Sequence, residues 1–258
     1  MRVEARHSNV SLVVVGTVHG DPKGYSKLVH FLKTETPDYL TVEISPYARE
    51  FRRQQGSILR GILRSNLRQI SRIRKTPLRR ILAHPAILGL FILLKEPYEW
   101  RAAYDYAREN GKSVEDIDLS AYSREKLAYL KEMTALENLM CLLDLPFEGL
   151  SELVDAQYRR ARNLFSHPPT SRISSSEMAV REIYMAERIR SLVRRAKEAK
   201  FIHIGGWEHL VDFPGKNSLW GRLKNLPARR ILLQGENAVC HANPRSIPRS
   251  CPGLFQRN

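Results

Sequence analysis

The stretch Ser11-Leu12-Val13-Val14-Val15-Gly16-Thr17-Val18-His19 decides the fold of this chain, because its apolar run predicts a buried strand that ends close to a histidine. The same arrangement returns later in Phe201-Ile202-His203-Ile204-Gly205-Gly206-Trp207-Glu208-His209. In both stretches a glycine stands three residues before the last histidine, which permits a sharp turn or a close approach of two backbones. Ligands of open α/β sheets bind at the carboxyl edge of the strands, so two histidines delivered there indicate a site.

Three further segments predict strands, and predicted helices alternate with them. These strands are 39–42, followed by Glu43; 113–119, which contains Asp118; and 230–234. Helices are expected at about 24–34, 46–94, 98–110, 123–165 and 174–200. This alternation favours an α/β fold, with a mostly parallel central sheet, helices on both faces and a basic helical insertion.

The chain of 258 residues is long enough to bury one sizeable core. We expect one α/β domain over 1–235, with the insertion at 46–95. Residues 236–258 are rich in proline, serine and arginine without apolar periodicity, and little order is expected there.

Cysteine usage and apolar segments predict a cytoplasmic protein. Cys141, Cys240 and Cys251 have no paired spacing, and Cys141 lies in a leucine-rich stretch that predicts a buried thiol. The first nine residues are polar and resemble no signal segment. The apolar stretch 81–94 is shorter than the roughly 20 residues that a membrane-spanning helix needs.

Positive charge is concentrated in the insertion. The formal net charge is +15, and residues 49–80 hold ten arginines and one lysine against a single acid, Glu50. Four arginines recur at every fourth position, namely Arg60, Arg64, Arg68 and Arg72, with apolar residues between them. The pattern predicts an amphipathic helix. One interpretation is that its apolar stripe packs on the core or on a second copy in a homodimer. The other is that the helix docks to an anionic membrane surface or to a protein partner. Nucleic acid is disfavoured, because few aromatic residues are present to stack on bases.

Four of the predicted strands end near an ionisable side chain. These are His19, Glu43, Asp118 and His209, and at the edge of a parallel sheet they can converge. Imidazole and carboxylate groups suit a divalent ion such as zinc, manganese or cobalt, which acidifies bound water. Each residue also has a simpler explanation, because a histidine after a strand is often a hydrogen-bonded turn residue and an aspartate often caps the next helix. His203 alternates with apolar neighbours inside its strand, and this pattern predicts a core histidine whose hydrogen bonds are satisfied.

Four segments in order resemble a known superfamily. They are Gly16-Thr17-Val18-His19, Pro37-Asp38-Tyr39-Leu40-Thr41-Val42-Glu43, Arg181-Glu182-Ile183-Tyr184-Met185-Ala186 and Gly206-Trp207-Glu208-His209. This order is similar to that of the TraB/PrgY/GumN/TIKI superfamily, whose wider group includes erythromycin-esterase-like and ChaN-like proteins. The resemblance covers about 13–234, although the insertion has no match. The chain departs from the common pattern at Trp207 and Glu208, where small residues are usual.

The resemblance implies a compact α/β fold with paired glycine-histidine motifs, a glutamate and an arginine facing one pocket. By position these are His19, His209, Glu43 and Arg181. TIKI members are metal-dependent peptidases, esterase-like members use histidine and glutamate to activate water, PrgY-like members act against signalling peptides, and ChaN-like members bind haem. Without the resemblance, an ion pair with Glu177, one helical turn earlier, is the simpler explanation for Arg181.

The leading hypothesis is a cytoplasmic, metal-dependent hydrolase of peptide or ester bonds, associated with the membrane periphery if the basic helix docks there. His19, His209, Glu43 and Asp118 are the candidate ligands, and a carboxylate not bound to the ion accepts a proton from the attacking water. Arg181 stabilises the oxyanion or binds a substrate carboxylate. The alternative is a non-enzymatic protein that binds a peptide signal or haem, with the basic helix docking it to a membrane or a partner.

Overall fold

A six-stranded sheet forms the centre of the computed structural model, which describes residues 11–146, 148–170, 176–196, 199–214, 218–234 and 239–242. Its strand order is β3-β2-β4-β1-β5-β6. The strands are β1 (Ser11–Thr17), β2 (Tyr39–Val42), β3 (Ser113–Asp116), β4 (Lys200–Gly206), β5 (Ala228–Leu232) and β6 (Val239–Ala242). Strands β1 to β5 run parallel and β6 pairs antiparallel with β5, which confirms the predicted mostly parallel α/β sheet.

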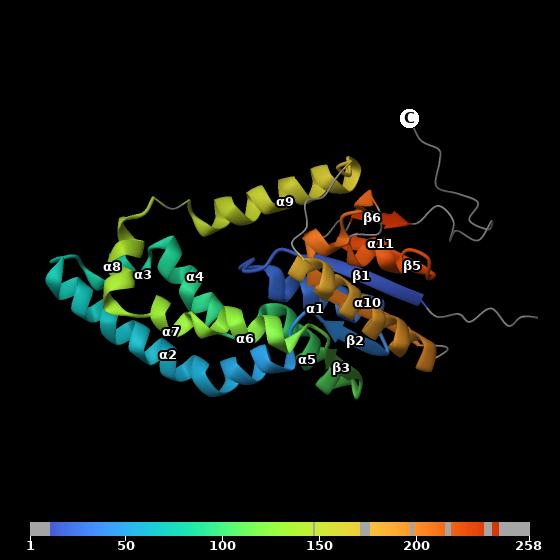
Figure 1. The fold of residues 1–258 in the computed structure, drawn as a ribbon, viewed down its shortest axis with the longest axis horizontal. Helices are drawn as coiled ribbons and strands as arrows, with labels where there is room; N and C mark the ends of the chain where they lie inside the picture. The colour runs from blue at the N-terminus through green and yellow to red at the C-terminus, as the bar shows by residue number, and fades with distance from the viewer. Residues whose placement is uncertain are drawn as a thin grey trace, which may run out of the picture.

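Helices surround the sheet and extend well beyond one side of it. They are α1 (Gly24–Glu35), α2 (Pro46–Ile73), α3 (Leu78–Leu82), α4 (Pro85–Leu93), α5 (Tyr98–Asn110), α6 (Ser120–Ala128), α7 (Leu130–Met133), α8 (Leu136–Asp144), α9 (Leu150–Ser166), α10 (Ser176–Arg195), the 3-10 helix η1 (Trp207–Leu210) and α11 (Leu219–Leu223). In Figure 1 the sheet lies at the right, and α2 to α4 with α6 to α8 form a helical extension at the left.

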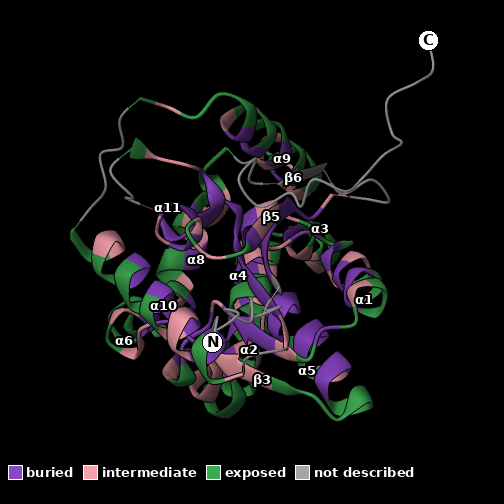
Figure 2. Cartoon of the chain, turned by 90° about the vertical axis from the view of Figure 1, so that its right-hand side faces the viewer, coloured by how far each residue is buried: buried purple, intermediate pink, exposed green. Residues whose placement is uncertain are grey.

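Alternation along β1 gives the sheet one core on each face. Val13 and Val15 belong to a cluster with α1, α5 and the helical extension, whereas Leu12 and Val14 belong to a second cluster with α9, α10 and α11. Successive strand side chains point to opposite faces, so a run of apolar residues is needed when both faces are covered. Figure 2 shows the strands buried among helices whose outer surfaces are exposed.

Helix α2 of the basic insertion is amphipathic, as predicted, but the helix expected at 46–94 is divided into α2, α3 and α4. Ser45 caps α2, with its hydroxyl oxygen accepting a hydrogen bond from the Ala48 amide at 3.0 Å, and Pro46 occupies the first turn. The buried stripe of α2 consists of Leu59, Leu63, Leu67 and Ile70, all part of the cluster on the first face of the sheet. The stripe thus packs on the core of the same chain. Ile58, Ile62 and Ile73 are exposed beside the arginines.

Several element ends differ from the predictions. Helix α10 ends at Arg195, and Lys200, its predicted last residue, begins β4. The third strand ends at Asp116 instead of residue 119, and β5 begins at Ala228, two residues before its predicted start. Ser174 and Ser175, at the predicted start of α10, lie outside the described residues.

Cys141 and part of the C-terminal tail are arranged differently from the predictions. The prediction that Cys141 is buried is wrong, because α8 turns Leu139 to the core and leaves Cys141 on an exposed face. Within the predicted tail, Val239–Ala242 forms β6, and the rest of that segment lies outside the described residues. In the described part of the chain, none of the helices has the length and apolar character needed to cross a membrane.

Candidate functional site

The two glycine-histidine motifs pack against each other at the carboxyl edge of the sheet. Gly16 is the register neighbour of Gly205, and Thr17 is that of Gly206. A Cβ atom on Gly16 would lie 3.1 Å from the Trp207 Cα, and one on Gly206 would lie 3.0 Å from His19 Nε2. Neither Gly16 nor Gly206 has a positive φ. These glycines therefore serve close approach, and each makes room for the other motif.

His19 is oriented by a buried carboxylate from α5. Its Nδ1 lies 2.8 Å from Glu99 Oε1, and Glu99 is 3% exposed. The Thr17 hydroxyl lies 3.1 Å from the same oxygen and 3.0 Å from the Gly205 carbonyl oxygen. Because Glu99 holds Nδ1, the other ring nitrogen, Nε2, is left facing Gly206, and 63% of the His19 side chain is exposed to the cavity described below.

The charge of Glu99 controls the protonation of His19. Enclosure by the surrounding side chains lowers the pKa of His19, but the charge and the hydrogen bond of Glu99 outweigh this effect and raise the pKa from 6.5 to about 9. His19 is therefore mostly an imidazolium at neutral pH. Above pH 9 it is a neutral imidazole whose Nδ1 proton faces Glu99 and whose Nε2 carries the lone pair.

Glu43 is the junction of the site. Its Oε1 accepts hydrogen bonds from Arg181 Nη2 at 2.8 Å and from His209 Nε2 at 2.7 Å, and its Oε2 accepts one from the Gly206 amide at 2.7 Å. Burial raises the pKa of the Glu43 carboxyl, but His209 and Arg181 hold it well below its usual range. The buried carboxylate is stable because each oxygen has a donor.

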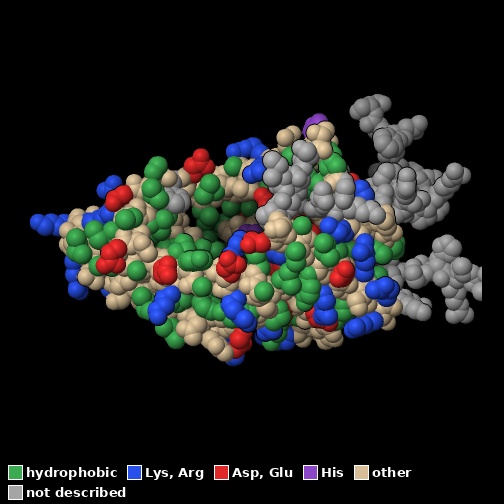
Figure 3. Space-filling model, in the orientation of Figure 1, with side chains coloured by type: hydrophobic (Ala, Val, Ile, Leu, Met, Phe, Trp, Pro, Cys, Tyr) green, Lys and Arg blue, Asp and Glu red, His purple; other side chains and the backbone are tan. Residues whose placement is uncertain are grey.

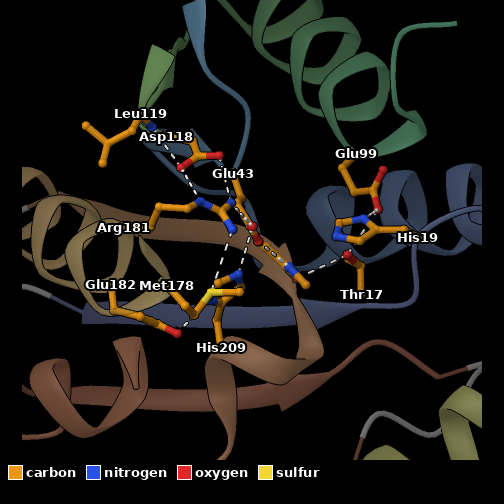
Figure 4. Close-up of polar contacts among 12 residues, drawn as sticks. Thr17, His19, Glu43, Glu99, Asp118, Leu119, Met178, Arg181, Glu182 and His209 are labelled. Atoms are coloured by element: carbon orange, nitrogen blue, oxygen red, sulfur yellow. Dashed lines mark hydrogen bonds and ion pairs between the residues drawn. The ribbon is translucent and has the colours of Figure 1, made fainter. Parts of the chain in front are cut away.

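His209 lies between two carboxylates. Its Nδ1 is 2.8 Å from Glu182 Oε1, on the side opposite Glu43, and Glu182 is fully buried. Burial lowers the pKa of His209, yet the two carboxylates raise it to about 10. At neutral pH both ring nitrogens therefore carry protons and donate to Glu43 and Glu182. Figure 4 shows His209 between these two carboxylates.

Arg181 joins Glu43 to Asp118. Its Nε and Nη2 donate to the two oxygens of Asp118 at 2.9 and 2.7 Å, and the ring of Tyr122 lies 4.5 Å from the guanidinium carbon. Such a bidentate pair fixes both the position and the plane of the guanidinium. The surface ion pair with Glu177 is not formed, because Arg181 is only 7% exposed and points inward.

The predicted metal ligands do not fit a metal site in this arrangement. Asp118 uses both oxygens for Arg181, and both nitrogens of His209 face carboxylates. Among the described residues there is no group of three or more His, Cys, Asp or Glu side chains arranged to hold a metal ion. The guanidinium of Arg181 occupies the place between Glu43 and Asp118 that a cation was expected to hold. In this arrangement Asp118 is the partner of Arg181.

His203 lies beneath the site, in the core. It is fully buried, and its Nδ1 lies 3.0 Å from the Thr41 hydroxyl, as expected of a core histidine. Its Nε2 has no hydrogen-bond partner within the described ranges, so the prediction that its hydrogen bonds are satisfied holds for one nitrogen alone. Burial lowers the pKa of His203 to about 4, and it is neutral.

The sequence predictions missed the two carboxylates that hold the histidines. Glu99 lies on the core-facing side of α5 with Ala102, Ala103 and Tyr106, at spacings of three, four and seven residues. Glu182 stands in the same relation to Met185, Ala186 and Ile189 of α10. An acid on the apolar face of a helix is the signal that would have found both, because a buried carboxylate needs a cationic or hydrogen-bonding partner.

A cavity of about 480 Å³, here called the main cavity, opens at this edge of the sheet. Its polar end is lined by His19, Glu43, Glu99 and Asp118. Trp207, the bulky residue of the second motif, lies in the core on the other face of the sheet and donates to Gln157 at 3.2 Å. It therefore leaves the main cavity open.

Comparisons with known proteins give no relative. The chain matches no family model, no curated protein and no solved structure.

Proposed function

We propose that this protein hydrolyses an ester or peptide bond, with His19 accepting the proton of the attacking water. The observation that supports this most directly is the pair formed by His19 and the buried Glu99: Glu99 holds Nδ1 of His19, and the largely exposed His19 side chain lines the main cavity. A histidine held at one nitrogen by a carboxylate keeps a single tautomer and orientation, which is what general base catalysis requires.

The proposed reaction uses His19 twice. Neutral His19 takes a proton from water at Nε2 while the water oxygen attacks the substrate carbonyl. The imidazolium, stabilised by Glu99, then returns this proton to the leaving oxygen or nitrogen as the tetrahedral intermediate collapses. The products are a carboxylic acid and an alcohol or amine, so atoms and charge balance without any further reagent.

Glu43, Arg181 and His209 form the fixed wall beside His19. Arg181 and His209 both donate to Glu43, so these three residues support each other and do not approach the substrate as free donors. We therefore assign them a positioning role in place of the predicted oxyanion role of Arg181. The proposal keeps the hydrolase activity that the resemblance to the TraB/PrgY/GumN/TIKI superfamily implies, and moves water activation from a metal to His19 and Glu99.

Hydrolysis of 4-nitrophenyl acetate and of a fluorogenic peptide set by the purified protein tests the proposal. His19→Ala should lower kcat/KM at least 100-fold, since general base catalysis contributes about 10² to 10⁴. His30→Ala is the matched control, because His30 is an exposed residue of α1 that does not line the main cavity. The assays are run with and without chelator. Activity that survives in His19→Ala, or that requires added zinc or manganese, would contradict the role given to His19.

A further inference from the structure

A second cavity of about 520 Å³ adjoins the main cavity, and we call it the side cavity. The two share part of their walls, namely Ala48, Arg52, Leu93, Asp118 and Ser123. The side cavity continues from the sheet edge toward α6 and α7 of the helical extension. Figure 3 shows this face of the molecule hollowed, with hydrophobic side chains gathered along the hollow.

The side cavity has a largely apolar lining. Leu127 and Leu130 are buried in its wall, and Leu93 and Met133 line it while remaining 45% and 38% exposed. Tyr122 and Tyr129 complete the apolar lining. Large side chains that stay exposed side by side in a concave site indicate a surface that an apolar ligand covers.

Arg52 stands where the two cavities meet. Its guanidinium donates to the carbonyl oxygens of Leu93 and Ala48 at 3.1 Å each. No carboxylate in the described part of the chain forms an ion pair with it, and Glu96 acts on it at longer range alone. Asp118, the acid in the shared wall, is bound by Arg181. Glu125, Glu177 and Lys126 also line the side cavity. Arg52 is therefore a cation in a cavity wall with room for an external anion.

We propose that the ligand of this site is an anionic amphiphile, whose apolar chain lies in the side cavity and whose carboxylate or phosphate pairs with Arg52. This inference rests on the proposed function in one respect, that the bond to be cleaved lies at His19 in the main cavity. The predicted substrates are therefore acyl esters or amides of long chain that carry a negative group near the scissile bond.

Direct binding tests the ligand class without any hydrolysis. Decanoate, decanol and acetate are titrated calorimetrically into the full chain. The chain and the charge should both contribute, so decanoate is expected to bind at least tenfold more tightly than decanol and at least 100-fold more tightly than acetate. Equal affinity for decanoate and decanol, or for decanoate and acetate, would overturn the proposal.

Two variants with matched controls locate the ligand. Arg52→Gln should weaken decanoate binding at least fivefold and leave decanol unchanged, whereas Arg53→Gln, on the exposed neighbouring residue, should change neither. Met133→Trp should fill the side cavity and weaken both ligands at least tenfold. Ile73→Trp is its control, because Ile73 is also exposed but lines neither cavity. Equal effects of a variant and its control would place the ligand elsewhere.

Hydrolysis separates this inference from the proposed function. His19→Ala should bind decanoate like the unchanged protein while losing esterase activity. Wild-type protein that binds decanoate as described but hydrolyses none of the esters supports the amphiphile site and contradicts the hydrolase. Wild-type protein that hydrolyses 4-nitrophenyl acetate and 4-nitrophenyl decanoate with equal kcat/KM, and does not bind decanoate, overturns the amphiphile site alone.

Discussion

Three histidines at one sheet edge have three different pKa values, and the number of carboxylates around each ring explains the order. His203 has Thr41 beside its Nδ1 and no acid in contact, and its pKa falls to about 4. His19 contacts Glu99 and reaches about 9, and His209 contacts Glu43 and Glu182 and reaches about 10. Loss of contact with water, which is nearly complete for His203 and His209 and partial for the exposed His19, lowers the pKa of each ring, so the order of the three pKa values comes from the neighbouring charges.

The pH dependence of activity follows from two of these values. Activity requires neutral His19, so kcat/KM should rise about tenfold per pH unit up to about pH 9. It should fall above about pH 10, where His209 loses the proton it donates to Glu43 or Glu182. Initial rates with 4-nitrophenyl acetate, corrected for spontaneous hydrolysis, measure this profile.

Glu99→Gln should move the acidic limb of that profile toward the ordinary histidine value of 6.5, because the charge that raises the pKa of His19 is removed. The amide still accepts a hydrogen bond, so the ring keeps its orientation. Glu96→Gln, an exchange of a neighbouring acid with no ion pair to His19, is the control. An acidic limb that stays at pH 9 in Glu99→Gln would show that His19 is not the group being titrated.

Gly206→Ala should reduce activity with little loss of stability. The added methyl group would lie 3.0 Å from His19 Nε2, and the exposed imidazole can move away. A displacement of this size at a reacting group lowers kcat/KM by about 10 to 100-fold. Gly61→Ala, at an exposed helical site with no atom within 4 Å, should leave activity unchanged and stabilise the fold by up to about 1 kcal/mol.

Helix α2 offers a test of packing at the scale of an element. Leu63 is fully buried against the core, whereas Ile62, its neighbour on the helix, is 39% exposed. Leu63→Ala should lower the free energy of unfolding by about 2 to 5 kcal/mol, and Ile62→Ala by less than about 1 kcal/mol. Urea unfolding followed by circular dichroism measures both. Equal losses would mean that α2 does not bury the stripe seen in the structure.

The sequence predicts elements well where the signal is local. Helix α5 runs from Tyr98 to Asn110 as predicted, and ends because Gly111 adopts a left-handed conformation with φ of 63°. Strand β6 has no such signal, since four residues gain stability by pairing with β5 and not from their own pattern. The break between α10 and β4 was also missed, because Ala196 and Lys200 suit a helix as well as a turn and a strand.

The topology predicts that the residues at the strand ends lie close together, but it does not predict their hydrogen-bond partners. Parallel strands bring His19, Glu43 and His209 to one edge, as the alternation of elements indicated. The partners of these residues come from helices α5 and α10, at positions that topology alone does not specify. A list of strand-end residues therefore suggested a metal, whereas the helices supply an arginine and two more acids that balance the charges.

At the scale of the whole molecule, the helical extension packs against the sheet. The buried side of α2 and one face of the sheet belong to the same hydrophobic cluster, so the cavities lie where the helical extension meets the sheet. Together the two cavities have a polar end at the sheet edge and an apolar end among the helices. An insertion that only decorated the surface would not contribute walls to the site.

Stability of the whole molecule should be greatest near pH 6.5. His209 is protonated in the folded protein up to about pH 10 but in the unfolded chain only up to about 6.5, so its contribution is complete below 6.5 and is lost as pH rises through 10. The buried, neutral His203 acts in the opposite direction, because the unfolded chain binds a proton below 6.5 that the folded protein refuses down to about pH 4. Glu43 adds to this acidic loss at lower pH, since the pKa of its carboxyl is held well below the unfolded value.

His19 and His209 both shape the alkaline side of this profile, because the folded protein raises the pKa of each above the unfolded value of 6.5. Between pH 7 and 9.5 His209 by itself should change the free energy of unfolding by up to about 1.4 kcal/mol per pH unit. His209→Gln, unfolded with urea at pH 7, 8 and 9.5, should lose that part of the slope, whereas His30→Gln should retain it because His30 is exposed on α1. The contribution of His19 remains in His209→Gln. A slope in His209→Gln equal to that of the unchanged protein would mean that the His209 imidazole is neutral in the folded protein, and that the hydrogen bonds to Glu43 and Glu182 are not both donated by it.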